Sequence, residues 1–106
     1  MKNLYRLSLL LCGSALCSVA LAHNPICECE AHGEEEILCV GGFSDGSGAP
    51  GVTLDVIGYD EEILVAGKLD GDSRLSFKRP DGEFYVLFDA GPGHVVEIDH
   101  ADIEAP

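Results

Sequence analysis

VTLDVIGYDEEILVAGKLDGDSRLSFKRPDGEFYVLFD, residues 52–89, is the stretch that decides the fold. Apolar and polar side chains alternate along it in four short runs, so that every second residue can face a core. Segments rich in Asp, Glu and Gly separate the runs, and these residue types favour tight turns. Runs of this length between turn residues indicate antiparallel β-strands.

Three further runs outside this stretch complete the pattern. The expected strands are 26–31, 37–43, 52–59, 63–69, 74–77, 83–89 and 94–100. Seven strands at this spacing predict an all-β domain, a sandwich of two antiparallel sheets of the transthyretin-like or Ig-like kind. The period of two predicts which side chains face the core, namely Cys27, Cys29, Ala31, Ile37, Cys39, Phe43, Val52, Leu54, Val56, Leu75, Phe77, Phe84, Val86, Phe88, Val96 and Ile98.

The first 22 residues have the composition of a cleavable signal peptide. Lys2 and Arg6 precede a largely apolar run over 7–19, and Ala20 and Ala22 form a small-residue cleavage motif. The apolar run is shorter than the roughly 20 residues that a membrane-spanning helix needs. We therefore expect export, cleavage after Ala22, and a single periplasmic domain over 23–106.

The charge of this chain limits its partners. The formal net charge is −13, and removal of Lys2 and Arg6 with the leader would take it to −15. A surface of this sign disfavours nucleic acid and anionic membranes and favours cations or basic protein faces. An alternative reading is that the acidity only keeps an exported protein soluble.

Three cysteines remain after the expected cleavage, Cys27, Cys29 and Cys39. An oxidising compartment favours a disulfide from Cys39 to either Cys27 or Cys29, with one thiol left over. The alternative is a soft Cu(I) or Zn²⁺ site formed by the three thiols and His32. The strand register would decide between the two disulfides, and the sequence does not fix it.

Histidines are the other candidate metal ligands. Cleavage after Ala22 would give His23 a free α-amine beside its imidazole, and these two donors can chelate Ni²⁺, Cu²⁺ or Zn²⁺. His94 follows Gly91-Pro92-Gly93, a sequence that favours a sharp loop at the rim of the sandwich. His32 and His100 are further imidazole donors at predicted strand ends. The simpler alternatives are a frayed terminus at His23 and a plain connecting turn at His94.

Several short motifs carry a family resemblance. Phe43-Ser44-Asp45-Gly46, Ala49-Pro50-Gly51, Asp70-Gly71-Asp72 and the run Asp89-Ala90-Gly91-Pro92-Gly93-His94 stand in this order. Together they resemble the small extracytoplasmic accessory proteins of nickel and cobalt energy-coupling-factor transporters, which are carboxypeptidase-regulatory-like, transthyretin-like β-sandwiches. The three cysteines depart from that family's pattern. The resemblance implies Ni²⁺ or Co²⁺ as cargo, a membrane transporter subunit as partner, and no enzymatic role.

Catalytic signatures are missing from the sequence. It contains no nucleophile elbow, phosphate-binding loop or zinc-protease helix motif. Together with the resemblance, this leads us to expect a non-enzymatic, metal-handling accessory protein that assists nickel or cobalt uptake, although Cu²⁺ and Zn²⁺ would also suit the donors. The alternative is a sandwich module that binds a protein or glycan partner and no metal.

Overall fold

The computed structural model describes residues 23–103. The expected signal peptide, 1–22, lies outside the described residues, as do 104–106. Within the described part the chain forms seven β-strands and one 3₁₀ turn, and each strand end lies within one residue of the sequence prediction. The elements are β1 Pro25–His32, β2 Glu36–Phe43, β3 Thr53–Gly58, β4 Ile63–Lys68, β5 Arg74–Lys78, β6 Phe84–Asp89, β7 Val95–Asp99 and η3 His100–Asp102.

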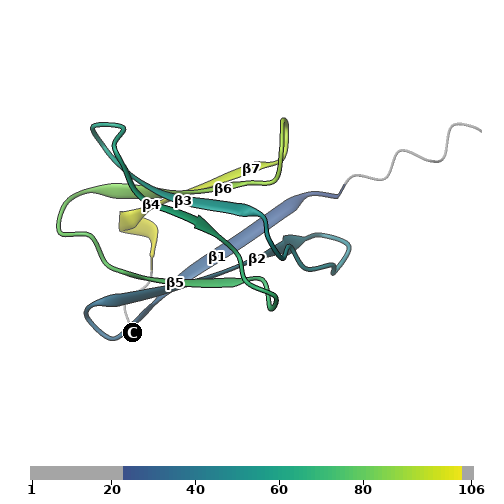
Figure 1. Ribbon diagram of the computed structural model, residues 1–106, viewed down its shortest axis with the longest axis horizontal. Helices are drawn as coiled ribbons and strands as arrows, with labels where there is room; N and C mark the ends of the chain where they lie inside the picture. Colours follow the sequence, from purple (N-terminus) through teal and green to yellow (C-terminus); the bar gives the residue numbers. More distant parts are fainter. Residues whose placement is uncertain (1–22, 104–106) are drawn as a thin grey trace, which may run out of the picture.

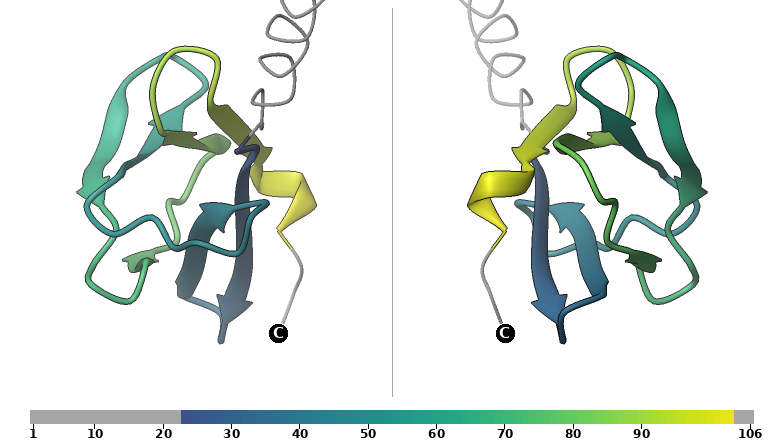
Figure 2. Two further views of the ribbon diagram at one scale, coloured as in Figure 1. Left: turned by 90° about the vertical axis from the view of Figure 1, so that its right-hand side faces the viewer. Right: turned by 90° about the vertical axis from the view of Figure 1, so that its left-hand side faces the viewer.

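The strands form two antiparallel sheets that face each other (Figures 1 and 2). One sheet has the order β1-β2-β5, and the other has the order β4-β3-β6-β7. This arrangement confirms the predicted β-sandwich. The edge strands β1 and β7 lie on one side of the sandwich, and the edge strands β4 and β5 lie on the other. No helix among residues 23–103 is long and apolar enough to cross a membrane.

Side chains of the predicted inward parity fill the core. Phe84 and Phe88 from β6 are almost fully buried, and Leu54 and Val56 from β3 lie beside them. The ring of Phe77 on β5 meets Phe84 edge-on at 6.5 Å between centroids, which joins the two sheets. Four further buried hydrophobic side chains were not predicted, because they lie in turns or have the outward parity: Ala49, Ile57, Leu69 and Ile103.

One glycine sets how closely the sheets approach. A Cβ at Gly41 in β2 would lie 2.7 Å from Cδ1 of Leu69 and 2.8 Å from Cε1 of Phe88. These side chains therefore occupy the space that any larger residue would need. In the register of the sheet Gly41 lies opposite Cys27, so the strand partner of Cys27 has no side chain.

The two ends of the sandwich carry different parts of the chain. β1 and β7 both start at the same end, where the described chain begins and the β6–β7 loop turns (Figure 1). Both strands finish at the opposite end, near the β1–β2 turn and the 3₁₀ turn. His23 and His94 therefore lie at one end, and His32 and His100 lie at the other.

Candidate functional site

A shallow hollow at the first end brings together two of the predicted metal ligands. It has a volume of about 370 Å³ and is lined by His23, Asp45 and His94, with Phe43, Ser47 and Ala90 as its remaining wall. Nδ1 of His23 lies 2.8 Å from Oδ2 of Asp45. The three polar side chains come from the start of the described chain, the turn after β2 and the loop before β7.

Asp45 is held in place by its own turn. Its Oδ1 accepts hydrogen bonds from the Ser47 backbone N–H at 2.9 Å and from the Ser47 hydroxyl at 2.6 Å. These bonds, assisted by the charge of His23, lower the pKa of the Asp45 carboxyl, so it is ionised at neutral pH. Because Ser47 uses Oδ1, the other oxygen, Oδ2, is left to face His23.

His23 is positioned by a reciprocal pair of contacts just after it. The Asn24 backbone N–H donates to the Ser44 hydroxyl at 3.0 Å, and the Ser44 N–H donates to the Asn24 carbonyl at 2.8 Å. These bonds extend the β1–β2 pairing beyond Pro25 and fix the chain beside the turn that carries Asp45. Asp45 is not among the site residues that the sequence predicted. The sequence did hold one signal for Asp45. In a hairpin of two antiparallel strands, the end of the second strand lies beside the start of the first, which brings the turn after β2 close to His23.

His94 is presented by a tight loop. The Ala90 N–H donates to the His94 carbonyl at 2.9 Å, and the His94 N–H donates to the Gly91 carbonyl at 2.8 Å. Gly91 and Gly93 have φ values of 117° and 79°, which other residues rarely adopt. Nδ1 of His94 lies 3.1 Å from the Pro92 carbonyl oxygen, which can only accept. In the neutral ring Nδ1 therefore carries the proton, and Nε2 keeps a free lone pair.

The other two predicted histidines do not join this hollow. His32 lies on the outer face of β1, with Nε2 3.2 Å from Oε1 of Glu30. His100 packs its ring against the rings of Tyr59 and Phe84, with centroid distances of 5.7 Å and 5.5 Å. Its Nε2 lies 3.9 Å from carboxylate oxygens of Glu83 and Asp99. The structure therefore places two of the four predicted histidines in the hollow and the other two at the opposite end, each with separate contacts.

The cysteines lie on the inner face of the first sheet. Cys29 on β1 is directly opposite Cys39 on β2, and a disulfide joins them with a Cα–Cα distance of 4.1 Å. So close an approach is typical of the non-hydrogen-bonded pairs of an antiparallel ladder. His32 has the opposite parity and points away from the three sulfur atoms. The structure therefore does not assemble the thiol–His32 site that the sequence left open.

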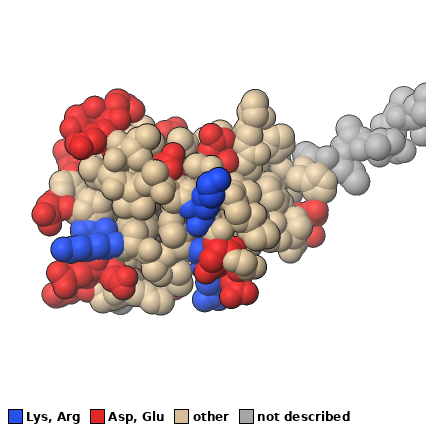
Figure 3. Space-filling view, viewed as in Figure 1, with Lys and Arg blue, Asp and Glu red and all other residues tan. Residues whose placement is uncertain are grey.

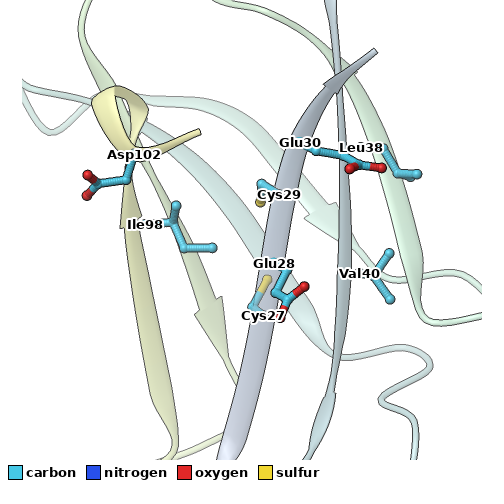
Figure 4. Close-up of a pocket in the computed structure, with 8 residues that line it drawn as sticks. All are labelled: Cys27, Glu28, Cys29, Glu30, Leu38, Val40, Ile98 and Asp102. Carbon is cyan, nitrogen blue, oxygen red and sulfur yellow. The ribbon is translucent and has the colours of Figure 1, made fainter. Parts of the chain in front are cut away.

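Cys27 is the free thiol of the described chain, and it is buried. It lies next to Cys29 along β1, beside a groove of about 470 Å³ whose far side carries Ile98 and Asp102 (Figure 4). Burial, with a smaller contribution from the charge of Glu28, raises the pKa of Cys27 to about 11. A thiol that stays protonated at neutral pH is a poor nucleophile and a poor metal ligand.

The described side chains alone do not complete a metal site. In residues 23–103, no group of three or more His, Cys, Asp or Glu side chains is arranged to hold a metal ion. The hollow supplies two imidazoles and one carboxylate along its wall. A free α-amine at His23 would add a further nitrogen donor. The donor set depends on whether the chain begins at His23.

Comparison of the chain with models of known families, with curated proteins and with solved structures finds no match.

Proposed function

We propose that this protein is a non-enzymatic, periplasmic metal-handling accessory protein that captures Ni²⁺ or Co²⁺ and passes the ion to a membrane transporter subunit. The single observation that carries the proposal is the hollow shared by His23, Asp45 and His94. Two histidines that are 71 positions apart in the sequence (23 and 94) line the same hollow as an ionised carboxylate.

The donors of the hollow fit a borderline transition metal. After cleavage, the α-amine and Nδ1 of His23 would close one chelate ring around the ion. Nε2 of His94 has a free lone pair, and Oδ2 of Asp45 already lies 2.8 Å from His23. Imidazole and amine nitrogens suit Ni²⁺, Cu²⁺, Zn²⁺ and Co²⁺, with affinity rising from Co²⁺ through Ni²⁺ to Cu²⁺.

Asp45 also has a role before the metal arrives. Its Oδ2 lies 2.8 Å from Nδ1 of His23, so it holds the ring beside the hollow until a metal binds; coordination through Nδ1 would replace this contact and release Oδ2 as a further ligand. Both histidines are exposed, which leaves the ion accessible for transfer to another protein. An open, shallow site of this kind suits temporary carriage better than permanent storage.

The remaining support comes from charge and sequence. The net charge of −15 expected for the processed chain would raise the local concentration of divalent cations around the protein. The signal-peptide composition of residues 1–22 supports a periplasmic location. The resemblance to accessory proteins of nickel and cobalt transporters supports a transporter subunit as the recipient.

Equilibrium dialysis of the exported, processed protein against Ni²⁺, Co²⁺, Cu²⁺ and Zn²⁺ tests the proposal. We expect one ion bound per chain at micromolar concentrations, with Co²⁺ the weakest of the series Co²⁺, Ni²⁺, Cu²⁺. Mass spectrometry must first show that the chain begins at His23. If all four ions fail to bind, the metal function is wrong, and a sandwich module for a protein or glycan partner becomes the better hypothesis.

A further inference from the structure

Three of the four sheet edges are protected by charge. β1 carries Glu28 and Glu30, β5 carries Arg74 and Lys78, and β7 carries Glu97 and Asp99. Charged side chains on an edge strand discourage pairing with another chain. β4 differs, because its residues 63–67 are all apolar or glycine and its only charge is Lys68 at the end.

The open side of β4 offers both apolar surface and backbone groups. Ile63 and Leu64 are 55% and 43% exposed. The Leu69 N–H donates to the Val52 carbonyl at 2.9 Å, just beyond the β3–β4 ladder. Backbone groups alternate sides along an antiparallel strand, so those of Ala66 and Lys68 point away from β3. An added strand could therefore pair with β4 by ordinary ladder hydrogen bonds.

We propose that two copies of this chain pair through antiparallel β4 strands about a two-fold axis, which joins their four-stranded sheets into one continuous sheet. A symmetric pairing of this kind uses the same strand from both copies and closes at a dimer. The proposal concerns a surface distinct from the metal hollow, because β4 lies on the side of the sandwich opposite β1 and β7.

Charge selects one register for this pairing. Alignment of Val65 with the partner's Val65 places Glu62 opposite the partner's Lys68, and symmetry repeats that ion pair. Moving the pairing by two residues in one direction would place Glu62 opposite the partner's Asp70, where like charges repel. Moving it by two residues in the other direction would place Asp60 opposite the partner's Lys68, but Asp60 lies in the β3–β4 turn, where its Oδ1 accepts from the Glu62 N–H at 3.1 Å, and so does not continue the extended strand. The first register is therefore the favoured one, and it places Leu64 beside the partner's Ala66.

The rest of the molecule makes this side the best place for two acidic chains to meet. The Lys and Arg residues of the described chain lie in β4 or in and directly after β5. Figure 3 shows basic side chains on the face turned to the viewer, with acidic side chains beside them. The ion pairs within residues 23–103 all use histidine as the basic partner. Lys68 is therefore not engaged by a carboxylate of the described chain and can pair with the second copy.

Sedimentation equilibrium of the processed protein across the micromolar range tests the proposal. We expect the wild-type mass to be that of a dimer. Glu62→Lys and Lys68→Glu should each raise the dissociation constant by about tenfold or more, because each places two like-charged pairs across the axis. The double variant Glu62→Lys/Lys68→Glu restores opposite charges and should restore the dimer.

Glu30→Lys is the matched control, because it makes the same charge change on the edge strand β1. It should leave the dimer intact, and far-UV circular dichroism should show that every variant keeps its β-sandwich. A wild-type protein that is monomeric throughout the micromolar range overturns the proposal. So does a charge-swapped double variant that stays as dissociated as either single variant.

Discussion

The two ends of the sandwich carry the same kinds of residue and arrange them differently. Each end has two histidines with carboxylates nearby. At the first end, His23 and His94 line one hollow, and Asp45 orients the ring of His23. At the second end, His32 pairs with Glu30 on the outer face of β1, while the ring of His100 packs against aromatic rings.

This difference shows that a shared surface, and not the number of histidines, defines the candidate site. His94 has a free Nε2 because its Nδ1 bonds to the carbonyl of its own loop. The ring of His100 packs against the rings of Tyr59 and Phe84. The comparison therefore predicts that metal affinity depends on the first end alone.

The largest expected effect on Ni²⁺ affinity comes from removing donors at the first end. One extra residue before His23 turns its α-amine into an amide, a much poorer donor, and should weaken Ni²⁺ binding by at least about tenfold. His94→Ala should weaken it by a similar factor. The two changes together should cost about a hundredfold if the donors act independently. Isothermal titration calorimetry with Ni²⁺ measures each affinity.

His32→Ala and His100→Ala are the matched controls for this experiment, because each removes one imidazole from the second end. Both should bind Ni²⁺ like the wild type. Binding should also fade as the pH falls below neutral, because amine and imidazole donors must lose their protons to bind a metal. An extended protein that binds as tightly as the processed one would show that the amine is not a ligand.

The second prediction concerns the disulfide that lies between the two ends. Cys29 and Cys39 are 10 positions apart, so the bridge closes a short loop and should contribute about 2–3 kcal/mol. The double variant Cys29→Ala/Cys39→Ala should lower the free energy of unfolding in urea by that amount. Thiol titration of the denatured, unreduced wild type should find one thiol in the processed chain, and three would contradict the bridge.

The third prediction uses Cys27, which lies beside the disulfide. Burial raises its pKa from 9.0 to about 11, so the folded state holds the proton more tightly than the unfolded state does. Its contribution to stability is complete below pH 9 and is lost as the pH rises through about 11. The free energy of unfolding should fall less steeply across this window in Cys27→Ala than in the wild type. If the free energy of unfolding fell equally steeply with pH in both proteins, the raised pKa of Cys27 would be contradicted.

The smallest expected effect lies at the second end. The Tyr59 hydroxyl donates to Asp99; this bond is the largest cause that lowers the pKa of Asp99 and raises that of Tyr59 to about 12. The stabilisation of the fold by ionised Asp99 is present at pH values above the ordinary carboxyl pKa. It is lost as the pH falls through the lowered pKa of Asp99. Tyr59→Phe should therefore lower Tm slightly at neutral pH and less in acid.

Tyr85→Phe removes a different tyrosine–carboxylate bond, to Glu61, and serves as the comparison. Neither variant should change Ni²⁺ affinity, because neither tyrosine lines the hollow at the first end. A change in Ni²⁺ affinity in Tyr59→Phe would show that the two ends are coupled. It would contradict the prediction that metal affinity depends on the first end alone.

Much of the fold could be predicted because its signals are local. The alternation Phe84, Val86, Phe88 assigns a buried face without any knowledge of neighbouring strands, and the structure confirms that face. Gly41 shows the limit of such reasoning. Its importance comes from Leu69 and Phe88, which reach it from other elements, so no local pattern reveals it.

The sequence by itself determined the strands, their inward faces, the acidic charge and the rim position of His94. The tertiary structure alone decided that Cys39 lies opposite Cys29 and that Asp45 lines the same hollow as His23 and His94. The physical reason is the range of the interactions. Strand periodicity follows from each residue and its neighbours, whereas register and the meeting of loops depend on how whole strands pack, and a shift by one residue would place different side chains together.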